Sequence, residues 1–447
     1  MARLNSAITI VLSWVVATLT SKERLRQRLN VSLYRNALYL MTTHALTGGF
    51  GLVFWLVAAR FYRAEDIGLA SAAISAMMLL ALLGTLGLDY ALIRFLPNSG
   101  RASGAMINSS LTLGGLASVI VALIFMAGLD LWSPALLFLR QHPVLFLAFV
   151  VFTAGTTLHM LVGRTFVAVR RAGFTLAQGI VFNVLRLVLV IILAAFFATF
   201  GILASWGLAA MAAVVIGVLL FLPRLHAGYR PLPVIKRKVV GELLHFSFTN
   251  YVTALLWFAP TFVLPLMVVN LLGAEANAYY YIAWAIANVL FAIPIATSFS
   301  LLAEGSHDEE RLGRDTRRSL MFTFATVVPA ALLIVLVGDR VLLLFDPAYA
   351  ENGTGLLRVL ALSAVPLSLN HIYFGVKRVQ MKMRGVVALS AFIAIATLAL
   401  AWVLLPEMGI LGAGIAWLSS QSVVALVIVI LWVPRTGKRL GAPAATR

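Results

Sequence analysis

The chain contains no cysteine and few acidic residues, with 16 Asp and Glu against 34 Lys and Arg in 447 residues. The absence of cysteine excludes disulfide bonds and thiolate metal sites. The sequence also lacks a G-x-x-x-x-G-K-[ST] phosphate loop and an H-E-x-x-H zinc motif, which are sequence signals of an ATPase and a metalloprotease. We therefore expect no enzyme activity, no catalytic residues, no metal site and no cofactor.

Apolar residues dominate the composition: 62% of the chain is hydrophobic and only 11% is charged. Twelve apolar stretches, most of them long enough to cross a bilayer as helices, predict an all-α integral membrane protein. Runs such as 187–198 are apolar on every side, which excludes the alternating strands of a membrane barrel. The predicted spans are 36–58, 67–93, 106–130, 143–163, 174–198, 202–222, 246–271, 278–303, 319–338, 355–376, 386–405 and 410–433.

The basic residues lie almost entirely on one side of these spans. Of the 34 Lys and Arg, 28 fall in loops or tails on one side, and Arg60, Arg63, Arg140 and Arg340 are the four on the other. Basic loops are retained in the cytoplasm, so we expect both termini to be cytoplasmic in a bacterial inner-membrane protein. This charge pattern suits anionic lipid headgroups, and the absence of a soluble domain argues against nucleic-acid binding.

The predicted domains follow from the loops. Residues 1–30 form a cytoplasmic or membrane-surface segment whose apolar run is too short to span; an overextended start codon is the alternative. Residues 31–223 form a first six-helix bundle, 224–240 a basic cytoplasmic linker, 241–434 a second six-helix bundle and 435–447 a cytoplasmic tail. No span carries voltage-sensor spacing or a filter loop, which disfavours a channel.

The two predicted bundles repeat each other in sequence. The segment that begins at His159 matches the segment that begins at His371 with an offset of 212, and the pairs at Glu65/Glu275 and Gly201/Gly409 have offsets of 210 and 208. Because six spans separate the matches, the repeats have the same orientation in the membrane. Transporters commonly bind substrate at such a repeat interface.

Polar side chains form stripes on equivalent helices of the two repeats, namely the first and second of each bundle. Polar groups inside hydrocarbon face protein or water, so these stripes indicate either a cavity or hydrogen bonds between packed helices. We interpret them as a cavity because they fall on equivalent helices. The stripe residues assigned to substrate binding are Asn36, Thr43, His44, Asn250, Trp257, Tyr281, Trp284 and Asn288.

Three charged residues within or near spans complete the predicted site. Arg186 lies midway along the fifth span, where a charge costs about 2.5–3.5 kcal/mol on insertion scales unless it meets water or a partner. Arg358 lies near one end of the tenth span and Asp89 near the inner end of the second, so both side chains have the alternative of reaching the surface.

Several segments resemble one known family along nearly the whole chain. Ala59–Gly68 and Leu86–Pro97 are similar to the N-terminal region of bacterial polysaccharide-biosynthesis flippases, the Wzx-like branch of the MOP superfamily. Leu342–Tyr349 resembles the family's outer loop before the tenth helix, and Gly409–Gly414 resembles its last hairpin. The resemblance implies a MATE-like arrangement of two bundles around a central cavity.

The resemblance also implies a function. Such a flippase moves undecaprenyl-diphosphate-linked oligosaccharide to the outer leaflet by alternating access, in contact with membrane lipids and with a polysaccharide polymerase and chain-length regulator as partners. Arg186 would then bind the diphosphate, and Trp257, Tyr281 and Trp284 would face the sugars. A multidrug or small-molecule exporter and a peptidoglycan-precursor flippase are the alternatives, and the coupling ion, H⁺ or Na⁺, is left open.

Overall fold

The computed structural model describes residues 32–225, 229–305 and 312–440, and these ranges fold into helices with no strand. The predictions for residues 1–30 and for the last seven residues of the tail lie outside the described residues. The first half contains α3 (Ser32–Phe61), α4 (Ala64–Gly84), α5 (Leu88–Phe95), α6 (Ser103–Ala127), α9 (Pro143–Ala168), α10 (Ala172–Ala194), α11 (Thr199–Ile216), η4 (Gly217–Phe221) and α12 (Leu222–Leu225). The second half contains α13 (Arg237–Leu272), α14 (Ala274–Gly305), α15 (Leu312–Leu343), α16 (Pro347–Val379), α17 (Met383–Met408) and α18 (Ile410–Leu440).

The predicted membrane spans are present. Eleven helices in the described ranges are long and apolar enough to cross a bilayer, and α3 contributes a shorter apolar stretch, Leu46–Phe61. This confirms the all-α membrane fold with about twelve spans. The α18 helix continues to Leu440, so part of the segment predicted as a tail is helical.

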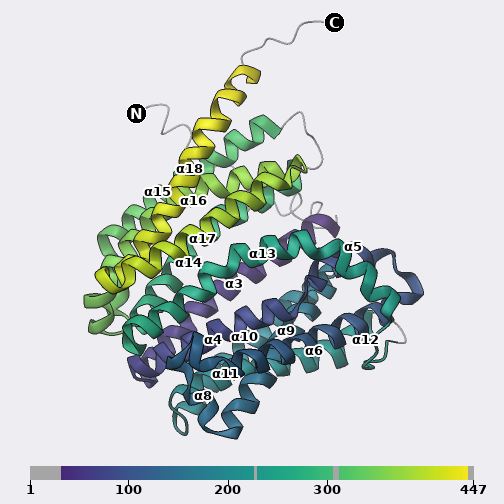
Figure 1. Ribbon diagram of the computed structural model, residues 1–447. Helices are drawn as coiled ribbons and strands as arrows, with labels where there is room; N and C mark the ends of the chain where they lie inside the picture. The colour runs from purple at the N-terminus through teal and green to yellow at the C-terminus, as the bar shows by residue number, and fades with distance from the viewer. Residues whose placement is uncertain (1–31, 226–228, 306–311, 441–447) are drawn as a thin grey trace, which may run out of the picture.

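The two halves form separate helix bundles. Figure 1 shows the green and yellow helices α14–α18 gathered at the upper left and the purple and blue helices of the first half across the lower part of the picture. The teal α13 runs between them, and it packs against α4 and α5 of the first half as well as α14 and α17 of the second. We call the ends at the connections Tyr62–Arg63, 128–142 and Gly273 the outer ends, because the charge pattern predicts that they face outward.

The second predicted span, 67–93, is wrong as one continuous helix. The helix α4 ends at Gly84, and a turn containing Leu86 at φ 51 and Gly87 at φ 76 separates it from α5. Two successive left-handed residues cannot continue a right-handed helix, and glycine adopts that conformation without steric cost. Asp89 therefore lies in the first turn of a separate short helix.

The basic linker is attached to the first bundle. Tyr229 donates a hydrogen bond from its hydroxyl to Asn108 Oδ1 at 2.8 Å, and Asn108 Nδ2 donates to the carbonyl of Arg230 at 2.8 Å. The backbone N–H of Lys236 donates to Ser109 Oγ at 3.1 Å. Burial raises the pKa of Tyr229 to about 12, so its hydroxyl keeps the proton that it donates throughout the neutral pH range.

Removing this hydroxyl is expected to loosen the linker. Tyr229→Phe leaves Asn108 Oδ1 without its donor in a buried position, which costs about 1–3 kcal/mol. We expect a lower midpoint in thermal unfolding of the purified protein and faster proteolysis within 224–240. Leu232→Ala, at a side chain that is 55% exposed in the same linker, serves as the control and should change neither. Equal behaviour of the two variants would contradict the assigned role of the hydrogen bond.

Candidate functional site

The first bundle buries one arginine inside a cage of aromatic rings. Arg186 on α10 is 2% exposed, and its guanidinium carbon lies 4.6 Å from the ring centre of Trp206. The same carbon is 5.1 Å from the ring of Phe54 and 5.0 Å from the ring of Phe182. The rings come from α11, α3 and α10, so three helices fix the position of this charge.

The cage leaves part of the guanidinium unsatisfied. Two of its nitrogens, Nε and Nη2, are buried without a hydrogen-bond partner, and no carboxylate in the described ranges forms an ion pair with Arg186. Contact with the aromatic faces stabilises the guanidinium by about 0.5–2 kcal/mol. Burying an ion costs several kcal/mol of hydration free energy, so the rings offset only part of this cost. The arrangement is therefore suited to an anion that brings its own oxygen acceptors.

Tyr281 of α14 brings the second bundle close to this cage. Its ring lies 4.8 Å from that of Trp55 on α3, and its hydroxyl is within hydrogen-bonding reach of Ser75 on α4. The charge of Arg186 is close enough to influence the Tyr281 hydroxyl. The cage thus adjoins the interface between the bundles, where a substrate between them would meet both a cation and two aromatic rings.

The outer ends of the two bundles are joined tightly. Asn277 of α14 is fully buried and donates from Nδ2 to the carbonyl of Gly68 at 2.7 Å and to Ser71 Oγ at 3.1 Å. A Cβ atom placed on Gly68 would lie only 1.6 Å from the carbonyl oxygen of Ala274. Arg60 Nη2 adds a hydrogen bond to the carbonyl of Leu344 at 2.7 Å. The outer path between the bundles is closed in this conformation.

At the opposite end, Asp89 is part of a cluster that also joins the bundles. Its carboxylate lies 3.9 Å from Arg164 Nε, and its Oδ1 atom is buried without a hydrogen bond among the described residues. Tyr251 of α13 lies beside it and donates a hydrogen bond to the carbonyl of Leu83 at 2.8 Å. Asp89 therefore belongs to this cluster and is not one of the residues that form the Arg186 cage.

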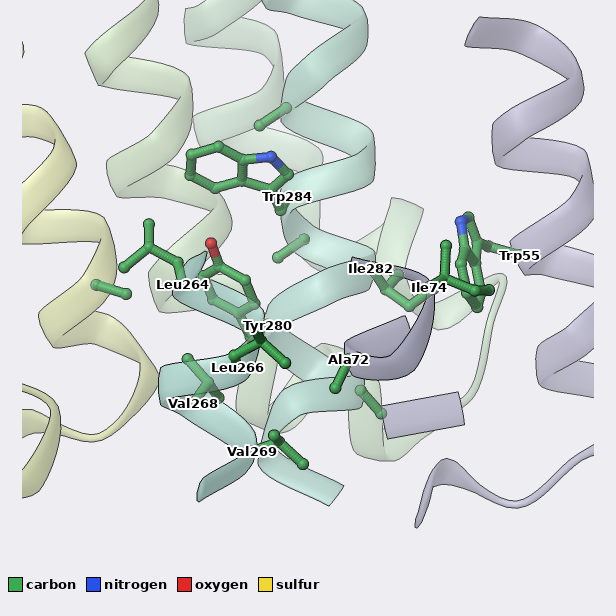
Figure 2. Close-up of a cluster of buried hydrophobic side chains, with 14 of the residues drawn as sticks. Trp55, Ala72, Ile74, Leu264, Leu266, Val268, Val269, Tyr280, Ile282 and Trp284 are labelled. Atoms are coloured by element: carbon green, nitrogen blue, oxygen red, sulfur yellow. The ribbon is translucent and has the colours of Figure 1, made fainter. Parts of the chain in front are cut away.

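Several predicted cavity residues lie elsewhere. Trp284 is 4% exposed and points into the second bundle, where its ring is 5.2 Å from that of Trp417 on α18. Figure 2 shows Trp284 and Tyr280 on the Leu264 side of α14, with Trp55 and Ile74 on the other side. Tyr281 and Trp284 are three residues apart, which separates their side chains by about 60° around the helix, so one meets the first bundle and the other the interior of the second.

The remaining predicted residues are also spread over several environments. Trp257 is half-buried against His371, with ring centres 4.7 Å apart inside the second bundle. Arg358 is exposed and donates from Nε to the carbonyl of Val335 on α15 at 3.0 Å, and Asn288 is exposed. Thr43 donates its hydroxyl to the carbonyl of Tyr39 within its own helix, and Asn250 is half-buried. The backbones of Asn36 and His44 are helical, but their side chains lie outside the described part of the chain.

The sequence interpretation missed the aromatic residues around Arg186. Phe182 precedes Arg186 by four residues, the spacing at which side chains meet on one helix face, so this contact had a detectable signal. Phe54 and Trp206 had none, because they come from other helices and only the tertiary packing brings them to the guanidinium. In the described ranges, no group of three or more His, Asp or Glu residues is placed to hold a metal ion.

Solved structures of membrane transporters have the same fold. The chain is similar to "Inward-facing conformation of a multidrug resistance MATE family transporter of the MOP superfamily", with TM-score 0.65, 15% identity and coverage of 89% of this chain and 96% of that one. It is also similar to "Lipid II flippase MurJ, inward closed conformation", with TM-score 0.70, 13% identity and coverage of 88% and 87%. A comparison with curated protein sequences gives no significant match. The two bundles therefore have the fold of these two membrane transporters.

A comparison with models of protein families assigns the chain to a family. The model described as "Polysaccharide biosynthesis protein" matches residues 33–301, which is more than half of the chain. The chain therefore belongs to the polysaccharide biosynthesis protein family. A second model, described as "MatE", matches residues 251–403 of the second bundle. Both matches agree with the resemblance found in the sequence.

Proposed function

We propose that this protein moves an undecaprenyl-diphosphate-linked oligosaccharide from the inner to the outer leaflet by alternating access of its two bundles. The observation that carries the proposal is the caged Arg186, a cation without a carboxylate partner beside the interface of the bundles in a member of the polysaccharide biosynthesis protein family. A guanidinium and a diphosphate form strong, charge-assisted hydrogen bonds. Tyr281 and Trp55 supply aromatic surfaces for sugars at the same interface.

The direct test uses purified protein in liposomes that contain an undecaprenyl-diphosphate-linked disaccharide. A membrane-impermeant periodate pulse oxidises only the sugars of the leaflet exposed to the medium. Protein-dependent movement of the protected half into the oxidised pool would support the proposal. Movement of an uncharged glycolipid at the same rate would show unspecific scrambling and contradict it.

A second candidate function is export of drugs or small molecules. The observation in its favour is the MatE match to residues 251–403, and Asp89 would then be a candidate for binding the coupling ion. Ethidium efflux from vesicles distinguishes the two functions, since efflux without any effect of lipid-linked oligosaccharide would favour the exporter. Flipping of the peptidoglycan precursor is a third candidate because the fold resembles the lipid II flippase, and the same liposomes with lipid II test it.

Energy coupling is part of the same proposal. We propose that a proton or sodium gradient drives the cycle, with no other cofactor. Dissipating each gradient separately in the liposomes identifies the ion. A polysaccharide polymerase and a chain-length regulator are the proposed working partners, because the flipped unit must be polymerised on the outer surface.

The orientation of the chain is a testable prediction. The 28 basic residues on one side predict that both termini and the 224–240 linker are cytoplasmic. Reporter fusions after residues 238 and 445 should be active only with a reporter that works in the cytosol. Fusions after Asp130 should show the opposite behaviour and serve as the control. Periplasmic activity at residue 238 or 445 would contradict the predicted orientation.

A further inference from the structure

A hollow of about 330 Å³ lies at the inner end of the first bundle, separate from the Arg186 cage. Its walls include Tyr39 of α3, Phe174 of α10 and Phe221 of η4, and the ring centres of Phe174 and Phe221 are 5.2 Å apart. Arg170 and Arg171, both exposed, lie in the turn between α9 and α10 and border the same hollow. Aromatic walls beside two guanidinium groups are suited to an amphiphile with an anionic head.

Backbone geometry keeps the two arginines at this position. Arg170 adopts the left-handed φ of 56, and the N–H of Arg171 donates to the carbonyl of Phe166 at 3.0 Å, which closes the end of α9. The turn leads directly into the 23-residue helix α10, whose N-terminus attracts anions through its dipole. The opposite wall is η4, a π-helical segment between α11 and α12, and such widened turns occur frequently at functional sites.

The surrounding sequence supplies no counter-charge for these arginines. Between Asp130 and Glu242 the chain contains no acidic residue, although it contains Arg164, Arg170 and Arg171 in this region. None of the residues that line the hollow is acidic. Any anion that pairs with Arg170 and Arg171 in the hollow therefore comes from outside this part of the chain.

The hollow also borders a lipid-facing surface. Leu219 and Leu220 of η4 are 54% and 49% exposed, and Ile180 of α10 is 41% exposed. A shallow furrow between α3 and α10, lined by Thr43 and Gly179 among others, lies one to two turns farther along the same helices. The hydrocarbon chain of a lipid bound at the arginines could therefore pack against apolar surface from the hollow into the membrane.

From these observations we propose that the hollow is a binding site for the phosphate head of a membrane lipid, with Arg170 and Arg171 contacting the phosphate and the lipid chain packing on Tyr39, Phe174 and Phe221. This chemistry is shared by an anionic phospholipid and by a polyprenyl phosphate. The site is independent of the Arg186 cage, and it does not depend on the transported substrate being correctly assigned.

The test is native mass spectrometry of the delipidated full-length protein, titrated separately with phosphatidylglycerol, undecaprenyl phosphate and zwitterionic phosphatidylcholine. We expect Arg170→Gln/Arg171→Gln to weaken binding of the anionic lipids at least tenfold and to leave binding of phosphatidylcholine unchanged. The matched control is Arg317→Gln/Arg318→Gln, another adjacent pair of exposed arginines, located on α15 and removing the same net charge. It should change binding less than twofold.

A second variant keeps both charges and fills the space. The Cβ atom of a residue at position 173 would sit 3.5 Å from the Tyr39 ring, an ordinary contact, so Gly173→Leu extends into the hollow without disturbing α10. It should reduce binding of the anionic lipids by a similar factor. Of phosphatidylglycerol and undecaprenyl phosphate, the preferred ligand of the site is the one that binds the wild type more tightly and loses that affinity in both variants. Binding within twofold of the wild type in both variants, or equal loss in the Arg317/Arg318 control, would overturn the site.

Discussion

Replacing Arg186 by glutamine is expected to reduce transport of the lipid-linked oligosaccharide on the order of 100-fold. Hydrogen bonds to charged groups contribute about 1.5–3 kcal/mol each, and every 1.4 kcal/mol changes an equilibrium tenfold. Glutamine removes the charge while roughly keeping the polar shape in the cage of Phe54, Phe182 and Trp206. The periodate assay in liposomes measures the effect, with protein content equalised by quantitative blotting.

Two further variants separate a role of charge from a role in packing. Arg186→Lys keeps a cation above the aromatic faces but loses the planar fork, so it should retain transport within about tenfold of the wild type. Arg358→Gln removes an exposed arginine of α16 that donates a hydrogen bond to the carbonyl of Val335, and it should leave transport nearly unchanged. Full transport by Arg186→Gln would exclude this residue from the mechanism.

Replacing Gly68 by leucine is expected to prevent closure of the outer ends and to stop the transport cycle. Any Cβ at this position meets the backbone of Ala274, which cannot move as a flexible side chain would. The bundles must separate there, which also breaks the hydrogen bonds of Asn277 to Gly68 and Ser71. We expect transport to fall at least on the order of tenfold. A loss of about 1.4 kcal/mol in the stability of the closed state lowers its population about tenfold.

A thiol reporter shows whether the cause is separation of the bundles. The chain has no cysteine, so Ser75→Cys introduces a single thiol at a position that is 2% exposed in the closed arrangement. Gly68→Leu should accelerate its reaction with an impermeant reagent added from outside, and Asn277→Ala should do so more weakly. Gly49→Leu is the control, since a Cβ at Gly49 has nothing within 4 Å. Lost transport with unchanged thiol reactivity would refute the explanation.

The fold was accessible from the sequence because a bilayer imposes one strong rule, namely that backbone polar groups pair within helices. The exception was the end of α4, where Leu86 adopts a left-handed φ. Leucine rarely adopts this conformation, so the residue type gave no reason to predict it. Asp89 was consequently placed at the end of the second span, whereas it lies in the first turn of the separate helix α5. A local backbone reversal of two residues is too short to change the hydropathy of a span.

The site was only partly predictable. The buried charge of Arg186 was recognisable because a mid-span arginine is costly, and Tyr281 does lie at the interface of the bundles. The structure does not bring Trp284 or Arg358 to the Arg186 cage: Trp284 packs against Trp417, and Arg358 donates to the carbonyl of Val335. Polarity alone does not reveal whether a side chain faces its own bundle, the partner bundle or lipid. The contacts of Phe54 and Trp206 with Arg186 could not be predicted from the sequence, because most residues of such helices are apolar.

In the proposed cycle, the uncompensated guanidinium of Arg186 is expected to make transport sensitive to the membrane voltage. A unit charge that crosses a potential of 100 mV changes in energy by about 2.3 kcal/mol. With an interior-negative potential, the empty transporter is drawn toward the state in which Arg186 faces the cytoplasm. A bound diphosphate carries more negative charge than one guanidinium neutralises, so the sign reverses and the loaded transporter is driven outward. In the proposed cycle, the membrane voltage therefore favours both the loaded outward step and the empty return.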